Sequence, residues 1–404
     1  MSEPSKHIAL YTDDPEFGGV AQYNHSVLLM LIAQGYRVTC IQPRSGSPLV
    51  KAQQAAGIQH EWIGFDAQKD FTRSITDLAD AERILGKIDP DFIIFSDCCP
   101  VSNIAARHAA VTRGIPYIVV VNFVAKYLAE KFKGCLGVLA KQHAYAQAVV
   151  AVSQENLDLL RNYFGTPAEK GVVIHYGRPA KYFAHPSAET RARLRAEMNI
   201  PTEGIVCFSA ARLTPIKGFQ HILSAAAALK NTLAWAHLYF VWAGDGELRA
   251  DLQKHIDMLG MSDRFRLLGQ RWDVCDLHEA ADMFALPSHF EGMPLTIMEA
   301  MARRVPVVAS AVSGIPEELG DTGCLIPSPE MNAEATVKGL AEAIARWTLD
   351  PAARGAAAEK SHARAQEFFR EELMLARVTK LVGDALLHAP AKKPAMVSAA
   401  AKLG

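Results

Sequence analysis

The sequence has few features of membrane-spanning, disulfide-bonded or nucleic-acid-binding proteins. Its longest aliphatic runs, residues 27–32 and 118–121, are far shorter than the roughly 20 apolar residues that cross a bilayer. The seven cysteines are scattered and include no C-x-x-C pair, which predicts reduced, buried thiols. A net charge of −1 offers no general attraction to nucleic acid. Because no apolar signal segment follows the first residues, we expect a cytoplasmic location, with at most peripheral contact at the inner face of a membrane.

Several catalytic motifs are also absent. Residues 278–282 read H-E-A-A-D, with aspartate where the zinc motif H-E-x-x-H needs its second histidine. The chain has no G-x-S-x-G elbow and no G-x-x-x-x-G-K-[ST] loop. The turn at residues 244–246 reads G-D-G, but Arg249 stands where a dinucleotide fingerprint has its third glycine. These absences argue against a metalloprotease, a hydrolase, a P-loop enzyme and a dehydrogenase.

The composition and the hydrophobic pattern indicate two α/β domains. The chain has 404 residues, of which 50% are hydrophobic and 21% charged, as in ordinary soluble proteins of two domains. Short apolar runs alternate with helical patterns, which is typical of parallel sheets covered by helices. A charged, proline-containing segment at 178–202, with a short helix at 188–197, separates the two halves. Strands are expected at 8–11, 38–41, 58–63, 92–96, 117–121, 149–152 and 172–177, then at 205–209, 238–243, 265–268, 281–288 and 305–310.

These patterns predict the domain boundaries. The first domain covers residues 1–185 and the second covers 200–365. An amphipathic helix over 361–387 is expected to return to the first domain through its part at 366–387. The alanine-, proline- and lysine-rich residues 388–404 are predicted to be a disordered tail.

A loop-to-helix transition at residues 289–302 carries two glutamates. Gly292 disfavours a helix and Pro294 suits the first helical position, so Glu291 lies on the loop. Glu299 follows on the helix, about 7 Å further along its axis. Amide groups at a helix start suit a phosphate, and carboxylates accept hydrogen bonds from vicinal hydroxyls. A sugar near Glu291 and a ribose near Glu299 fit this chemistry, although glutamate pairs at this spacing also occur on ordinary surface helices.

Two further loops carry features that suit an anion. After the strand at 205–209, Arg212 can fork onto phosphate oxygens and Lys217 adds a point charge near a helix start. Taken alone, the pair also fits two exposed cations. After the first strand, Gly18 and Gly19 open a helix and let the backbone approach an anion closely, or else form a tight turn with positive φ.

Together these stretches resemble the retaining glycosyltransferases of the GT-B fold, family 4. Residues 291–300 match the family pattern E-G-x-P-L-x-x-x-E-A, and residues 212–218 match R-L-x-x-x-K-G. The match is strong over residues 205–330 and looser in the amino-terminal half. The resemblance implies two Rossmann-like domains that face each other across a cleft, the first on the acceptor side and the second binding a nucleotide sugar.

The resemblance also implies roles for individual residues. Glu291 would orient the sugar, while Arg212 and Lys217 would stabilise the leaving diphosphate. Asn122 stands where the family commonly has a histidine at the sugar; the alternatives are that it caps a helix from Phe123 or marks an inactive homologue. The donor-binding set implied by the family is Gly18, Gly19, Gly244, Gly246, Arg271, Gly292, Met293, Pro294, Leu295 and Glu299.

The expected partners are a nucleoside-diphosphate sugar, with UDP as the nucleotide common in the family, and a glycan or lipid-linked acceptor. No cofactor, no metal and no nucleic acid are expected. The lysine-containing stretch 126–147 is either a solvated helix face or a basic patch for anionic lipid or acceptor. Two alternatives stay open: a nucleotide-sugar epimerase, and a sugar-nucleotide-binding homologue without transferase activity. Release of nucleoside diphosphate only in the presence of an acceptor separates a transferase from both.

Overall fold

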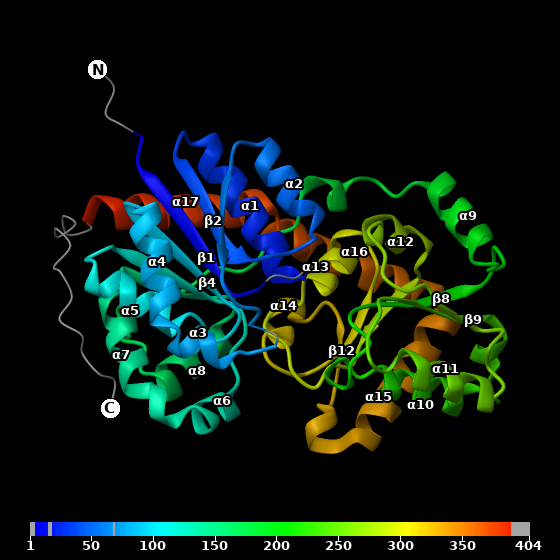
Figure 1. Ribbon diagram of the computed structural model, residues 1–404. Coiled ribbons are helices and arrows are strands. Elements are labelled where there is room, and N and C mark those ends of the chain that lie inside the picture. The colour runs from blue at the N-terminus through cyan, green and yellow to red at the C-terminus, as the bar shows by residue number, and fades with distance from the viewer. Residues whose placement is uncertain (1–4, 15–17, 68, 389–404) are drawn as a thin grey trace. The chain divides into compact units, whose positions relative to one another are not determined.

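The chain divides into two compact units in the computed structural model, which describes residues 5–14, 18–67 and 69–388 (Figure 1). The first unit comprises Met1–His175 with Met374–Gly404, and the second comprises Tyr176–Leu373. The sequence predicted that the first domain ends at residue 185, that the second begins at residue 200, and that the chain returns to the first domain through a helix from residue 366. Each unit contains one parallel sheet of its own, and the two units are described separately.

The first unit is built on a seven-stranded parallel sheet in the order β3-β2-β1-β4-β5-β6-β7. Ile8 in β1 pairs with Val38 in β2 and with Phe92 in β4, so the strand order reverses between β1 and β4. Such a reversal opens a crevice at the carboxyl ends of the strands, where α/β proteins bind ligands. The strands are β1 (His7–Thr12), β2 (Arg37–Pro43), β3 (Gln59–Ile63), β4 (Phe92–Asp97), β5 (Tyr117–Val121), β6 (Ala148–Ala151) and β7 (Gly171–Val173).

Helices cover both faces of this sheet (Figure 1), and its strands β1, β4, β5 and β6 are buried because most of their side chains are apolar on both faces. The last helix joins this unit, where Gln34 Nε2 donates a hydrogen bond of 2.7 Å to Thr379 Oγ1. The helices are α1 (Gly19–Ala33), α2 (Pro48–Ala55), α3 (Thr72–Thr76), α4 (Leu78–Ile88), α5 (Ile104–Thr112), α6 (Lys126–Lys131), α7 (Leu136–Tyr145), α8 (Gln154–Phe164) and α17 (Glu371–His388), with a 3₁₀ turn η1 (Lys133–Cys135).

The second unit has a six-stranded parallel sheet in the order β10-β9-β8-β11-β12-β13, with its reversal between β8 and β11. Phe219, Trp242 and Phe265 pack edge to face in its core, with ring centroids 5.0 and 5.1 Å apart. The strands are β8 (Ile205–Ala210), β9 (Leu238–Ala243), β10 (Phe265–Leu267), β11 (Met283–Leu286), β12 (Val307–Ser310) and β13 (Cys324–Ile326).

The helices of the second unit surround this sheet. They are α9 (Ala188–Glu197), α10 (Phe219–Leu229), α11 (Arg249–Met258), α12 (Val274–Ala280), α13 (Leu295–Ala302), α14 (Ile315–Leu319), α15 (Pro329–Leu349) and α16 (Pro351–Phe368), with 3₁₀ turns η2 (Ala180–Phe183), η3 (Pro215–Lys217) and η4 (Leu233–His237). Two Rossmann-like α/β domains were predicted from the sequence, and the two parallel sheets confirm that fold class.

Some local predictions were wrong. The helix expected over 126–147 is interrupted by η1, which contains Gly134, and the helix expected over 361–387 breaks at Phe369 between α16 and α17. All seven cysteines are free, but Cys98 is exposed and only three of the seven are buried. Residues 389–404 of the predicted tail lie outside the described residues. In the part of the chain that the structure describes, no helix has both the length and the apolar character needed to span a bilayer.

Candidate functional site

Two loops meet at the carboxyl ends of β8 and β11, where the strand order of the second unit reverses. Gly218 has a φ of +73°, and a Cβ at this position would lie 1.9 Å from the carbonyl oxygen of Pro287. The backbone N–H of His289 donates to the carbonyl of Ile216 at 2.8 Å. The loop after β8 and the loop after β11 are therefore locked together by backbone contacts that only glycine permits.

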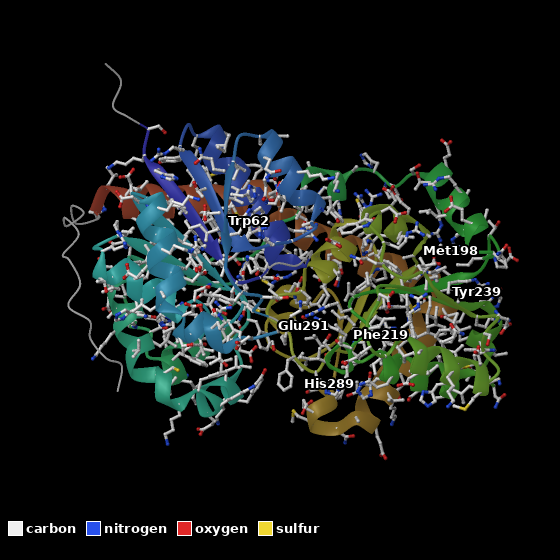
Figure 2. All side chains as sticks on the ribbon, in the orientation of Figure 1. Trp62, Met198, Phe219, Tyr239, His289 and Glu291 are labelled. Atoms are coloured by element: carbon white, nitrogen blue, oxygen red, sulfur yellow. The ribbon has the colours of Figure 1, made fainter. Side chains whose placement is uncertain are left out.

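The structure brings Lys217 and Glu291 together across these two loops. Lys217 Nζ lies 2.7 Å from Oε1 and 2.8 Å from Oε2 of Glu291. Ser288 Oγ donates to Glu291 Oε1 at 2.7 Å, and the backbone N–H of Glu291 donates to Ser313 Oγ at 3.2 Å. Glu291 is 6% exposed and is labelled in Figure 2 beside His289. The carboxylate is held by Lys217 and Ser288 while Ser313 holds the backbone of Glu291, and the cation comes from the loop that the sequence assigned to phosphate.

Arg212 lies on the same loop as Lys217, and the glycine turn after β9 packs against it. A Cβ on Gly244 would lie 1.9 Å from the carbonyl oxygen of Ala211, and one on Gly246 would lie 2.5 Å from that of Leu213. The backbone N–H of Leu213 donates to the carbonyl of Asp245 at 2.9 Å. Gly244 and Gly246 therefore permit a close backbone approach that supports the Arg212 loop, and the Arg212 side chain itself is exposed.

Arg271 has a local partner. Its Nε donates to Asp273 Oδ1 at 2.7 Å, and this hydrogen bond lowers the pKa of Asp273. The loop that carries Arg271 reaches the glycine turn through the backbone, because the N–H of Gly244 donates to the carbonyl of Gly269 at 2.8 Å.

The segment after Glu291 is largely buried. Met293 is 3% exposed and Leu295 is 7% exposed. The carbonyl of Gly292 accepts from the backbone N–H of Gly314 at 3.1 Å. Pro294 was predicted at the first helical position and is instead the residue before it, with a ψ of 114° that lies outside the helical region. These residues hold the amino end of α13 in place under the loop of Glu291.

Glu299 forms an ion pair with a cation that was not predicted from the sequence. Arg178 Nη2 lies 2.7 Å from Glu299 Oε1, and both side chains are at most 5% exposed. The Arg178 guanidinium also stacks on the ring of Tyr182, 4.6 Å from its centroid. Burial raises the pKa of Glu299, and the charge of Arg178 opposes that rise. Arg178 directly follows the residues H-Y-G at 175–177, and no local pattern there points to a pairing with Glu299.

In the first unit, Gly18 and Gly19 begin α1 at the carboxyl end of β1. Gly18 has a φ of −72°, and a Cβ at this position would meet nothing within 4 Å. The alternative of a tight turn with positive φ is therefore wrong for both glycines. Residues 15–17, just before them, lie outside the described residues.

Asn122 follows β5 at the same edge of the sheet. Its Nδ2 donates to the carbonyl of Asp97 at 2.9 Å and to Ser96 Oγ at 3.2 Å, and the residue is 5% exposed. The next helix, α6, begins at Lys126 with Ala125 as its cap. The alternative that Asn122 caps a helix from Phe123 is therefore wrong.

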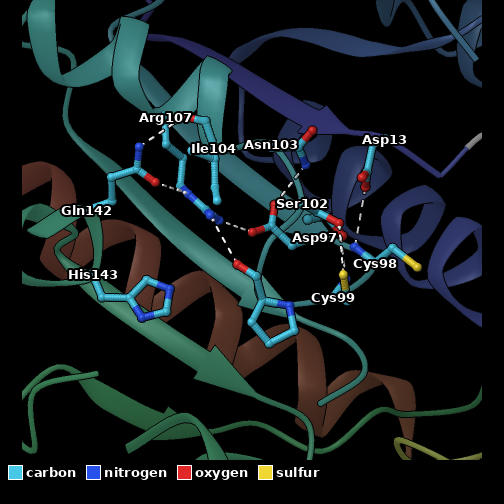
Figure 3. Close-up of polar contacts among 12 residues, drawn as sticks. Asp13, Asp97, Cys98, Cys99, Ser102, Asn103, Ile104, Arg107, Gln142 and His143 are labelled. Atoms are coloured by element: carbon cyan, nitrogen blue, oxygen red, sulfur yellow. Dashed lines mark hydrogen bonds and ion pairs between the residues drawn. The ribbon is translucent and has the colours of Figure 1, made fainter. Parts of the chain in front are cut away.

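Two buried aspartates at the reversal of this sheet were not predicted. Asp97, the last residue of β4, forms a fully buried ion pair with Arg107, and Asn103 Nδ2 donates to its Oδ1 at 2.8 Å (Figure 3). Arg107 Nε donates in turn to Gln142 Oε1 at 3.0 Å. Burial raises the pKa of Asp97 to about 7, although Arg107 opposes the rise.

The second of these aspartates, Asp13, follows β1 and lies beside the Asp97 cluster in Figure 3. Its Oδ2 accepts from Ser74 Oγ at 3.1 Å and its Oδ1 from the backbone N–H of Cys98 at 3.4 Å. Burial raises its pKa. The signal in the sequence was an aspartate at the end of one strand, β4, and another directly after β1.

Two family models match the chain. The model described as "Glycosyl transferases group 1" matches residues 190–363, and the model described as "Glycosyltransferase Family 4" matches residues 17–182. The chain belongs to the family 4 glycosyltransferases of the GT-B fold. The first match covers the Lys217 and Glu291 loops, and the second covers the first unit from residue 17 onward, which includes β4 and Asn122 but not β1.

Among named relatives, the chain is 29% identical over 264 residues to alpha-D-kanosaminyltransferase of Streptomyces kanamyceticus, covering 61% of this chain and 65% of that protein. It is 29% identical over 252 residues to a D-inositol 3-phosphate glycosyltransferase of Saccharomonospora viridis, covering 57% and 54%. The matched region thus spans between about half and two thirds of the length of these relatives.

Solved structures of the same fold include HepE of Anabaena in complex with UDP and glucose, with a TM-score of 0.77 and 19% identity over 94% of this chain and 100% of that one. Sucrose-phosphate synthase from Thermosynechococcus elongatus has the same TM-score and identity over 95% and 99% of the two chains. At this identity the likeness shows the fold of the glycosyltransferase family. Among the described residues, no group of three or more His, Cys, Asp or Glu is placed to hold a metal ion.

Proposed function

We propose that this chain transfers a sugar from a nucleoside-diphosphate sugar to a hydroxyl of a glycan or glycolipid acceptor, with retention of configuration. The observation that carries the proposal is the Lys217–Glu291 contact, which joins the two loops at the sheet reversal of the second unit. Such a reversal is where α/β sheets bind ligands, and here it presents a carboxylate and two cations. The role that fits this chemistry is glycoconjugate or cell-surface polysaccharide synthesis.

In this proposal Glu291 orients the sugar, and Arg212 and Lys217 bind the diphosphate. Negative charge grows on the diphosphate as the glycosidic bond breaks, and fixed cations stabilise that charge in the transition state. An ammonium has three donors. Glu291 accepts from Lys217 at two oxygens, which leaves a third donor for a phosphate oxygen. A diphosphate oxygen would receive the acceptor proton, so no separate base is required.

UDP is the proposed nucleotide of the donor, because the HepE structure of the same fold was solved with UDP. The sugar and the base are tested together by titrating UDP-, GDP- and ADP-sugars and measuring both melting temperature and nucleotide release. Release of UDP only when an acceptor is present supports transfer, and the anomeric coupling in the product reports retention. Formation of an epimeric nucleotide sugar without acceptor would instead support an epimerase.

The alternative of a binding homologue without transfer rests on Asn122, which stands where the family commonly has histidine. Neutral asparagine can hold a sugar hydroxyl but adds no titration near pH 6.5. We expect Asn122→Ala to abolish turnover while UDP still binds, and Asn122→His to retain turnover. If the wild type shows no turnover and Asn122→His is active, the transferase hypothesis is wrong and the chain is a binding homologue.

The proposed location is the cytoplasm, with peripheral contact of α6 and α7 at the inner membrane face. Lys126, Lys131, Lys133 and Lys141 are exposed there, Glu130 is the single acid in residues 126–147, and Tyr127 is 52% exposed. A cationic face with exposed aromatics suits anionic lipid. Co-sedimentation with phosphatidylglycerol vesicles but not with phosphatidylcholine vesicles is the expected result; equal recovery with both would assign these lysines to the solvated surface.

A further inference from the structure

Glu318 is a buried acid to which the proposed mechanism gives no role. It lies in α14 with a relative exposure of 0%. Within the described residues, neither of its side-chain oxygens makes a hydrogen bond of ordinary geometry, although the backbone N–H of Met298 lies near the carboxyl group. An ionised carboxylate in such a place is very costly, and a buried carboxyl group with so little hydrogen bonding calls for an explanation. The side chain is therefore expected to carry a proton.

The backbone ties Glu318 to the candidate donor site. The N–H of Glu318 donates to the carbonyl of Gly314 at 2.9 Å, and the N–H of Gly314 donates to the carbonyl of Gly292 at 3.1 Å. Ser313, one residue before Gly314, accepts from the N–H of Glu291 at 3.2 Å. Glu318 thus lies one helical turn from the residues that hold the Glu291 loop.

Charged groups around Glu318 come from three elements. Burial raises the pKa of Glu318 well above its ordinary value, and the negative charge of Glu291 raises it further. The backbone N–H of Met298 in α13 and the guanidinium of Arg364 in α16 oppose the rise. Arg364 bonds to the main chain of Glu318, because its Nε donates to the Glu318 backbone carbonyl at 2.8 Å. The site cation Lys217 pairs with Glu291 at 2.7 Å.

We propose that Glu318 is a positioning residue of the donor site, which keeps its proton so that the Glu291 loop carries one negative charge instead of two. With Glu318 neutral, Lys217 and the amino end of α13 face a single carboxylate and retain attraction for a diphosphate. When Glu318 ionises, a second carboxylate competes for the same cation and repels the phosphates. Donor binding should then weaken as pH rises. This role rests on the proposed function.

The first test compares UDP affinity of the wild type, Glu318→Gln and Glu318→Leu from pH 6 to 9 by calorimetry. At each pH, UDP carries the same charge whichever of the three proteins it binds. The ratio of the wild-type affinity to a variant's affinity therefore measures the effect of Glu318 ionisation. We expect wild-type affinity to fall relative to both neutral variants, by up to about tenfold per pH unit beyond the ionisation. The matched control is Glu317→Gln, a half-buried neighbour on the same helix, which should follow the wild type.

A second test needs no ligand. The unfolded chain loses the Glu318 proton near the ordinary glutamate pKa, whereas the folded chain keeps it to higher pH. Between these two values the folded state binds more protons, so wild-type stability falls as pH rises through this window and is level above it. The melting-temperature advantage of Glu318→Gln and Glu318→Leu over the wild type should therefore grow from about pH 4.5 upward.

The outcomes separate the two claims. No UDP binding by the folded wild type at any pH overturns the proposed function, and the role of Glu318 with it. UDP binding whose pH dependence is the same in the wild type, Glu318→Gln and Glu318→Leu overturns only the role of Glu318. If the melting-temperature difference between the wild type and the neutral variants stays constant from pH 4.5 to 9, the pKa of Glu318 is not raised in the folded state. This result would overturn the inference independently of UDP.

Discussion

Glu291 and Glu299 come from one sequence pattern, yet their surroundings differ. Glu291 meets Lys217, whose side chain is 19% exposed, on a loop at the carboxyl end of β8. Glu299 meets Arg178, whose side chain is 5% exposed, on the segment before η2. The first pair is partly accessible through Lys217, whereas the second is sealed because both of its side chains are buried. Spacing places both glutamates, but the cation that each one meets decides what it does.

The largest expected effect tests the sealed half of this comparison. Arg178→Ala leaves Glu299 buried without its cation, and breaking one partner of a buried pair costs about 3–5 kcal/mol. We expect a large fall in denaturation midpoint in urea. The matched control is Arg193→Ala, which breaks an exposed pair with Glu197 whose side chains are 54% and 49% exposed. An exposed pair contributes less than about 1 kcal/mol, so equal losses in both variants would mean that Glu299 is not sealed.

The open half of the comparison is tested by Lys217→Ala. Because phosphate charge grows in the transition state, we expect kcat to fall about 10²–10³-fold, with a smaller fall in stability than in Arg178→Ala because Lys217 is more exposed than Arg178. Lys338→Ala, whose side chain is 77% exposed, is the control for removing a lysine charge. A Lys217→Ala protein that loses affinity for the donor but keeps kcat would place Lys217 in ground-state binding only.

Substituting the two glutamates by glutamine compares them directly. Glu299→Gln should weaken UDP binding about ten- to hundredfold if a ribose competes with Arg178 for this carboxylate, since a charge-assisted hydrogen bond contributes about 1.5–3 kcal/mol. Glu291→Gln should lower turnover more than UDP affinity. Unchanged UDP affinity in Glu299→Gln would remove the ribose assignment and leave Glu299 as an anchor for Arg178.

The sequence predicted the elements well where the signal was local. The strands β5 and β9 have the bounds expected from their continuous apolar runs, and α9 matches the expected helix at 188–197. The pairing of Glu299 with Arg178 could not be read, because it joins residues far apart in the chain and depends on tertiary packing. Glu318 follows a proline and another glutamate, a pattern that reads as a surface helix start, and only the packing of α14 buries it.

The smallest expected effect concerns metal. In the proposed mechanism, Arg212 and Lys217 supply the positive charge that a divalent ion supplies in other transferases, so we expect activity to be unchanged after EDTA and dialysis. This follows from the contact of Lys217 with the site carboxylate, because a lysine already within 2.8 Å of both oxygens of Glu291 competes with a metal for the same ligands. The control is Lys217→Ala assayed with and without manganese. Loss of wild-type activity in EDTA that returns with manganese or magnesium would show that the two cations do not suffice. A Lys217→Ala protein that gains activity from manganese, while the wild type does not, would show that lysine and metal ion fill the same role.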